Sequence, residues 1–180
     1  MLDLIARRKL DRFEKEWSYD VGYLRDVLEC GGIDALAPMA GMEKISSYRR
    51  DIPLAPYFAA KLIATRHGDC GPCVQLGVKM ALRAGVSADV IRDVLANNVA
   101  ALPEDVALTV EFTQATLRRE PAAESLRTRI EQRWGKRAVI SLSYGIAGSL
   151  FYPAFKYALG YGHACSLVHV GDLSVKPAAV

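Results

Sequence analysis

Two cysteines near the middle of the chain have the spacing of a redox-active dithiol. Cys70 and Cys73 enclose Gly71 and Pro72 at the predicted start of a helix. One helical turn separates the two thiols, so their sulfurs can join in a short-loop disulfide. The free amides and positive dipole end of a helix N-terminus stabilise thiolate over thiol, and thiolate attacks peroxides and disulfides. The pair is therefore the predicted functional centre.

Two polar residues just before the pair are its candidate partners. His67 carries an imidazole whose pKa is ordinarily near neutrality, so it is a candidate base that takes the thiol proton and returns it to a leaving group. A histidine that only hydrogen-bonds its own loop is the alternative. Asp69 either orients His67 or caps the free amides of the helix. The predicted catalytic set is therefore Cys70, Cys73, His67 and Asp69.

Two other interpretations of the cysteine pair stay open. Most free cysteines are simply small buried hydrophobes. A zinc site is the second alternative, in which His67 and the pair are joined by His163, Cys165 or His169, although these lack the regular spacing of zinc modules. We therefore expect neither a metal nor an organic cofactor in the preferred interpretation.

Composition and charge exclude several classes of protein. The 180 residues are 51% hydrophobic, and the net charge of +3 comes from 23 basic and 20 acidic residues spread along the chain. No nucleic-acid partner is expected from this pattern. Arg7, Arg8 and Lys9 stand where an export signal needs an apolar run, and four cysteines make a thin disulfide framework, so a cytoplasmic protein is expected.

An uncharged stretch, residues 138–155, is the one segment that resembles a membrane span. It is 18 residues long and includes Gly145, Gly148 and Pro153 along with several serines and tyrosines. That length is at the short end of what a bilayer requires. We therefore expect a helix buried between other helices and no membrane partner.

Helical spacing of apolar residues along nearly the whole chain predicts an all-α fold, with no strand. Residues 33–47 are expected to form a helical connector, and residues 161–180 a Gly-rich tail. The expected helices cover residues 2–17, 20–29 up to Gly31-Gly32, the segment opened by Pro53 and Pro56 through Ala64, the cysteine pair to Gly85, Ser87 to about Ala101, Pro103 to just before Pro121, 122–134 and 136–159.

The helix that begins at the cysteine pair is expected to turn its thiols toward the protein interior. At 100° per residue, Gln75, Lys79 and Arg83 form one polar stripe opposite Cys70 and Val74. Thioredoxins use the same CGPC tetrapeptide, but they place it after a strand. Residues 61–66 continue a helical pattern here, so we reject the thioredoxin fold and keep its chemistry.

Beyond the pair itself, a longer part of the chain resembles a known family. The helix before the pair, the pair's own helix running into residues 84–87, and the helix that follows are similar to the alkylhydroperoxidase D and carboxymuconolactone decarboxylase superfamily. Residues 102–105, 119–121 and 134–139 echo its closing helices. The resemblance covers about residues 45–158. It implies an alkylhydroperoxidase D-like helical bundle at residues 45–160, a helical extension at residues 1–44 and a tail at residues 161–180.

The resemblance also implies a chemistry and an assembly. Members of the redox branch reduce peroxides or exchange disulfides with a partner thiol protein, and commonly form trimers or hexamers. The second cysteine usually attacks and the first resolves, which assigns attack to Cys73 and resolution to Cys70. Gly77 and Phe58 stand where the redox branch usually has a histidine and a glutamate, so the usual proton relay is missing. His67 is the nearest replacement base.

The expected function is therefore a thiol-dependent oxidoreductase that acts on a peroxide or disulfide and is reduced by a thiol protein. A homo-oligomer is expected through residues 138–157, whose small residues permit close helix approach. Gly77 costs about 1 kcal/mol relative to alanine inside a helix, so it is expected to leave space for a ligand, a side chain or another helix. The alternatives are a helical oligomer that uses the pair as a redox sensor or docking element, and a zinc-binding protein.

Overall fold

Helices make up nearly all of the regular structure in the described residues, which confirms the all-α prediction. The structure is a computed structural model that describes residues 2–162, 168–171 and 173–177. Its elements are α1 (Leu2–Trp17), α2 (Gly22–Ser47), α3 (Leu54–His67), α4 (Gly71–Arg83), α5 (Ala88–Leu95), the 3₁₀ turn η1 (Val99–Ala101), α6 (Glu104–Arg118), α7 (Ala122–Trp134), α8 (Lys136–Ala158), β1 (Val168–Val170) and β2 (Leu173–Val175).

Helix α3 lies at the centre and packs against α4, α5, α6 and α8. One side of α3 contributes Leu62 and Ile63 to a core shared with α4, α5 and α6. Another side contributes Ala60 and Ala64 to a core shared with α6, α7 and α8. A helix that is apolar on all sides is stable only when other elements cover it. Because α3 is buried, the cysteine pair that follows its last residues lies next to the interior of the molecule.

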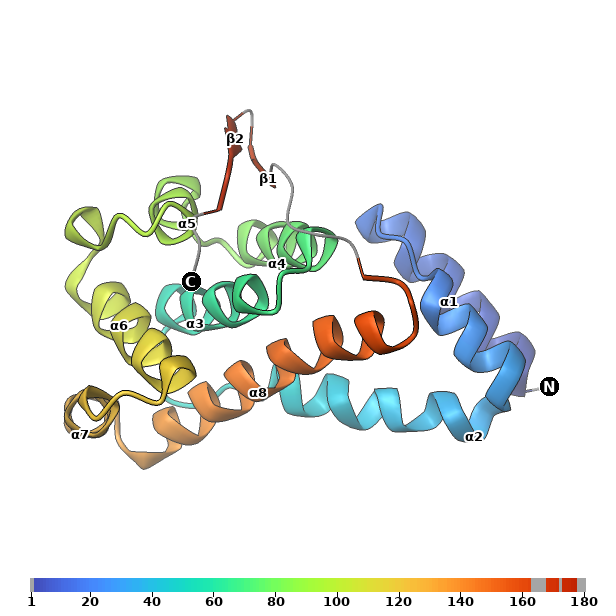
Figure 1. Ribbon diagram of the computed structural model, residues 1–180, viewed down its shortest axis with the longest axis horizontal. Helices are drawn as coiled ribbons and strands as arrows, with labels where there is room; N and C mark the ends of the chain where they lie inside the picture. Colours follow the sequence, from blue (N-terminus) through green and yellow to red (C-terminus); the bar gives the residue numbers. More distant parts are fainter. Residues whose placement is uncertain (1, 163–167, 172, 178–180) are drawn as a thin grey trace.

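Helices α1 and α2 pack together at one end of the molecule, and α2 then runs along α8 (Figure 1). A third core cluster joins them through buried residues that include Leu10, Tyr19 and Tyr23, and it reaches Leu76 of α4 and Phe155 of α8. The expected boundary between residues 44 and 45 falls inside α2. The N-terminal segment thus covers the helix that carries the cysteine pair.

One helix end agrees with the sequence prediction and one differs. Within α2 the regular helix is broken by a kink at Gly32, which takes φ +68°, so the predicted stop at Gly31-Gly32 and the helical segment after it are both present. Helix α5 ends at Leu95 instead of near Ala101, since Asn97 takes a left-handed conformation at φ +57° that a helix cannot contain. Asparagine is one of the few residues that adopts this conformation readily.

A short antiparallel hairpin, β1 with β2, was not expected from the sequence. Val168 pairs with Val175 and Val170 with Leu173. Val168 and Val170 are buried against the core of α4 and α5, whereas His169 between them is exposed. The hairpin projects beside α4 and α5 in Figure 1. Three residues per strand are too few for a reliable sequence signal, and packing on α4 fixes the conformation.

Helix α8 is the one helix among the described residues that is long and apolar enough to cross a membrane. It packs against α2, α3 and α7, as expected of a helix buried between others. A side chain on Gly145 would meet Tyr57 of α3, and one on Gly148 would meet Ser46 of α2. These two glycines thus allow α8 to approach α3 and α2 closely within one chain. A contact between two chains would have to use other residues of α8.

Lys61 of α3 has a largely buried amine at the junction of α2, α3 and α8. Its Nζ donates to the Ser46 carbonyl oxygen at 2.7 Å and lies over the rings of Tyr57 and Phe58. Burial lowers the pKa of Lys61 to about 8. In the unfolded chain a lysine has its ordinary pKa of about 10.4. Between pH 8 and 10 the unfolded state therefore binds more protons, and the free energy of unfolding rises with pH.

We expect Lys61→Met to flatten this rise. The wild-type slope from Lys61 is at most about 1.4 kcal/mol per pH unit, and the variant lacks it. Urea unfolding at pH 7, 8, 9 and 10 measures both proteins, and the ionisation of the tyrosines is common to both. Equal slopes for wild type and variant would show that the Lys61 amine is not desolvated in the folded protein.

Candidate active site

The cysteine pair is placed at the first turn of α4, as predicted. Cys70 is the N-cap residue, Cys73 follows within the first turn, and the two are joined in a disulfide. Pro72 also lies in this turn, where its missing N–H costs no helical hydrogen bond. Both cysteines are buried, with 1% of Cys70 and 7% of Cys73 exposed. The prediction that they face the interior is confirmed.

His67 and Asp69 lie in the tight turn that joins α3 to α4. His67 ends α3 and is exposed, and its ring makes no hydrogen bond to another residue that the structure describes. Asp69 takes φ +48°, the left-handed conformation that reverses the chain between the two helices, and its carbonyl oxygen accepts from the Tyr157 hydroxyl at 3.3 Å. The N-cap position belongs to Cys70, one residue later than the expected cap at Asp69. His67 and Asp69 are thus neighbours of the pair along the chain.

Apolar packing occupies Gly77 and Phe58, the two positions at which the sequence resemblance leads one to look for ionisable groups. A side chain on Gly77 would lie 3.1 Å from a methyl group of Leu62, so the space at Gly77 is taken by α3. This is the "another helix" alternative among the three expected for Gly77. Phe58 packs against both central cores. Neither position supplies an acid or a base to the sulfurs.

Two residues that the sequence analysis missed are linked to Cys73, Tyr19 directly and Lys156 through Tyr19. The Tyr19 hydroxyl is 3.8 Å from the Cys73 Sγ, and Lys156 Nζ donates to the Tyr19 hydroxyl at 3.3 Å. Tyr19 comes from the connector between α1 and α2, and Lys156 from the last turns of α8. Only 7% of Tyr19 and 3% of Lys156 is exposed. Their separation along the chain leaves no motif by which sequence reasoning could have found them.

Burial dominates the electrostatics around this contact. It raises the pKa of Tyr19 to about 12, against the opposing effect of a hydrogen bond with Tyr23. It also raises the pKa of Tyr23, and it lowers the pKa of Lys156 in spite of the charge of Asp20. The Lys156 Nζ lies 5.0 Å from the centre of the Tyr19 ring and 5.1 Å from that of Tyr23. At neutral pH both tyrosines are therefore neutral donors, while the Lys156 ammonium is destabilised.

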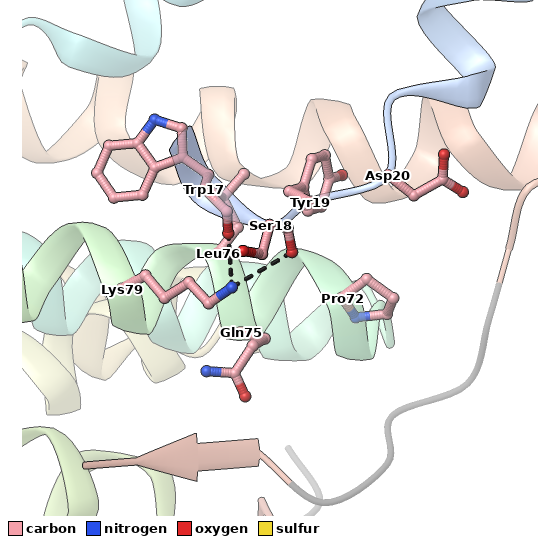
Figure 2. Close-up of a pocket in the computed structure, with 8 residues that line it drawn as sticks. All are labelled: Trp17, Ser18, Tyr19, Asp20, Pro72, Gln75, Leu76 and Lys79. Atoms are coloured by element: carbon pink, nitrogen blue, oxygen red, sulfur yellow. Dashed lines mark hydrogen bonds between the residues drawn. The ribbon is translucent and has the colours of Figure 1, made fainter. Parts of the chain in front are cut away.

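A small cavity of about 150 Å³ lies beside Pro72, the residue just before Cys73 (Figure 2). Its walls come from the end of α1, the α1–α2 connector and the exposed side of α4, and consist of Trp17, Ser18, Tyr19, Asp20, Pro72, Gln75, Leu76 and Lys79. Lys79 donates to the carbonyl oxygens of Trp17 and Ser18, as the dashed lines in Figure 2 show. Lys79 thereby holds the connector that carries Tyr19 against α4.

The predicted polar stripe of α4 binds neighbouring elements. Besides Lys79, the Gln75 side chain donates to the His169 carbonyl oxygen at 2.9 Å and accepts from the His169 N–H at 2.7 Å. Arg83 forms an ion pair with Glu16 of α1 and lies over the Trp17 ring. Gln75 therefore binds the hairpin, whereas Lys79 and Arg83 bind the end of α1 and the connector that follows it.

The zinc interpretation gains no support from the described residues. Among them, no three histidine, cysteine or acidic side chains come together in a group that could hold a metal ion. His163 and Cys165, two of the proposed ligands, lie outside the described residues. Cys30 is exposed and is not in a disulfide.

Comparison with known proteins does not identify the site. No protein-family model, curated protein or solved structure matches the chain. The site consists of the disulfide at the start of α4, the buried contact of Cys73 with Tyr19, the hydrogen bond from Lys156 to Tyr19, and the adjoining cavity.

Proposed function

We propose that the protein is a thiol-dependent oxidoreductase that reduces a peroxide or a disulfide through Cys70 and Cys73. The observation that carries this proposal is the placement of both sulfurs, within bonding reach, at the N-terminus of α4. The unpaired amides of a first helical turn stabilise thiolate, the reactive form of cysteine. A structural disulfide that closes so short a loop has little unfolded-state entropy to remove, so stabilisation is a weak reason for this bridge.

For a peroxide substrate the reaction balances with the two thiols alone. The Cys73 thiolate attacks one peroxide oxygen, the O–O bond breaks, and the products are a Cys73 sulfenic acid and an alcohol or water. Cys70 then attacks the sulfenic sulfur, releasing water and closing the disulfide. A reducing thiol protein supplies the two electrons and two protons that reopen it. Cys73 is the attacking residue in this proposal because it is the more exposed of the two residues and its sulfur is the one in contact with a polar group.

The wider context of the proposal follows the sequence resemblance. We propose an alkylhydroperoxidase D-like bundle without an organic cofactor, in the cytoplasm, where thiols are kept reduced. We also propose a homo-oligomer, whose candidate contact residues are now the exposed apolar side chains of α8, Ile140, Tyr144 and Tyr157. A monodisperse monomer in light scattering at micromolar concentration would contradict the oligomer.

Thiol counting combined with peroxide consumption tests the function. One equivalent of peroxide is expected to remove two thiols from the reduced protein, and peptide mapping is expected to locate the new bond between Cys70 and Cys73. With a dithiol reductant the consumption should become catalytic. A main disulfide from either residue to Cys30 or Cys165, or zinc bound in proportion to the protein, would overturn the assignment.

A second candidate function is a redox sensor without peroxidase turnover. The burial of both sulfurs and the apolar packing of Gly77 and Phe58 favour it. It predicts that the Cys70–Cys73 disulfide forms and is reduced stoichiometrically, whereas peroxide is not consumed catalytically with excess dithiol. The same thiol-counting experiment therefore separates the two functions.

A further inference from the structure

The hydrogen bonds that join Lys156 to Tyr19, and Tyr19 to Cys73, have a defined direction. A disulfide sulfur has no hydrogen, so across the 3.8 Å contact the Tyr19 hydroxyl must be the donor and the sulfur the acceptor. The hydroxyl oxygen then accepts from Lys156 Nζ at 3.3 Å. The two hydrogen bonds run in one line from the end of α8, across the α1–α2 connector, to the first turn of α4. Such a line can pass a proton in either direction.

We infer that Lys156, acting through the Tyr19 hydroxyl, is the proton acceptor and donor of the Cys73 thiol. The inference rests on the proposed thiol function of Cys73. It assigns to Lys156 and Tyr19 the proton transfer for which Gly77 and Phe58 provide no ionisable group. Lys156 and Tyr19 come from separate elements, and both are almost fully buried. A lysine is removed from water at a cost of several kcal/mol unless a nearby group compensates. The anionic form of Cys73 is such a group.

The other ionisable groups around this line do not replace it. Tyr23 of α2 and Tyr152 of α8 are neutral at ordinary pH, since burial raises the pKa of each. Asp20 in the connector is exposed, and its carboxylate accepts from the Gly22 N–H. On the α3–α4 turn, which packs on α8 through Gly68 and Pro153, lie His67, which is exposed, and Asp69. Cys70 on α4 is the partner of Cys73.

Proton transfer along this line balances for the reduced protein. The Cys73 thiol donates to the Tyr19 oxygen while the Tyr19 hydroxyl donates to the neutral Lys156 amine. The result is a Cys73 thiolate, an unchanged Tyr19 hydroxyl and a Lys156 ammonium. When the thiolate attacks a peroxide, the departing alkoxide or hydroxide takes back one proton along the same route, and Lys156 returns to its neutral form. Burial lowers the pKa of Lys156, which favours the neutral amine that this step uses.

The pH dependence of Cys73 alkylation in the reduced full-length chain tests the inference. Mass spectrometry follows the Cys73 peptide alone, so Cys30 and Cys165 do not interfere. Lys156→Met and Tyr19→Phe are each expected to raise the pH midpoint of alkylation, and each rise of one pH unit should slow the reaction at pH 7 about tenfold. Lys61→Met is the matched control, because it removes another largely buried lysine amine, one that binds Ser46 and the Tyr57 ring instead. It should leave the Cys73 midpoint unchanged.

The double variant distinguishes a relay from a packing effect. Because Tyr19 and Lys156 act in series, Tyr19→Phe combined with Lys156→Met should move the midpoint no further than either single variant. Additive changes, or an unchanged midpoint in both single variants, would overturn the inference. Thermal unfolding of each protein shows that the comparison is made on folded chains.

The outcome is independent of peroxide turnover. Wild type that consumes no peroxide but shows a Lys156-dependent midpoint would refute the proposed peroxidase and leave the relay standing. Catalytic turnover with a Lys156-independent midpoint would do the reverse.

Discussion

Replacing Cys73 with serine is expected to abolish peroxide reduction, with turnover in excess dithiol falling by at least about a hundredfold. A serine hydroxyl is not ionised near neutral pH, so the first step has no nucleophile. Cys70→Ser should behave differently, because Cys73 can still attack. That variant is expected to consume one equivalent of peroxide and then stop at a Cys73 sulfenic acid, which a sulfenic-acid trap followed by mass spectrometry detects.

The two variants control for each other, since each removes one sulfur from the same first turn of α4 and opens the same disulfide. A loss of stability common to both cannot produce opposite single-turnover results. If Cys70→Ser lost the first reaction and Cys73→Ser retained it, the roles of the two cysteines would be reversed. If both variants still consumed the first equivalent of peroxide, the reactive thiol would lie outside the pair.

Gly148→Ala is expected to lower the free energy of unfolding by about 2–3 kcal/mol. An added Cβ would lie 2.6 Å from the Ser46 Cβ and 2.8 Å from its Cα, distances at which one helix must move. The end of α2 cannot move alone, because the Tyr57 hydroxyl and Lys61 Nζ both donate to the Ser46 carbonyl oxygen. The close approach of α2 and α8 therefore depends on glycine at position 148.

Gly41→Ala is the matched control for this substitution. Gly41 lies within α2, and an added Cβ there meets no atom within 4 Å. The gain in helix propensity should stabilise this variant by about 0.5–1 kcal/mol. Urea unfolding of the two variants and wild type measures the difference. A similar effect at both glycines would show that α2 and α8 do not approach closely at Ser46.

The amino-acid sequence by itself determined the helices and the place of the cysteine pair. Ser87 accepts from the Val90 N–H at the start of α5, and Gly85 takes φ +93° after α4, as their residue types predict. The bounds of α6, α7 and α8 and the inward direction of Cys70 and Cys73 also agree with prediction. These features depend on propensities, caps and apolar spacing within a few residues of each other, and such signals can be read along a single chain.

Only the tertiary structure decided what surrounds the sulfurs. Tyr19, Cys73 and Lys156 come from the α1–α2 connector, α4 and α8, and no sequence pattern connects them. The hairpin at Val168 and the use of Gly148 against Ser46 likewise depend on packing between elements. Contacts of this kind depend on how amphipathic helices pack against one another, and the residues that meet across such an interface share no local sequence pattern.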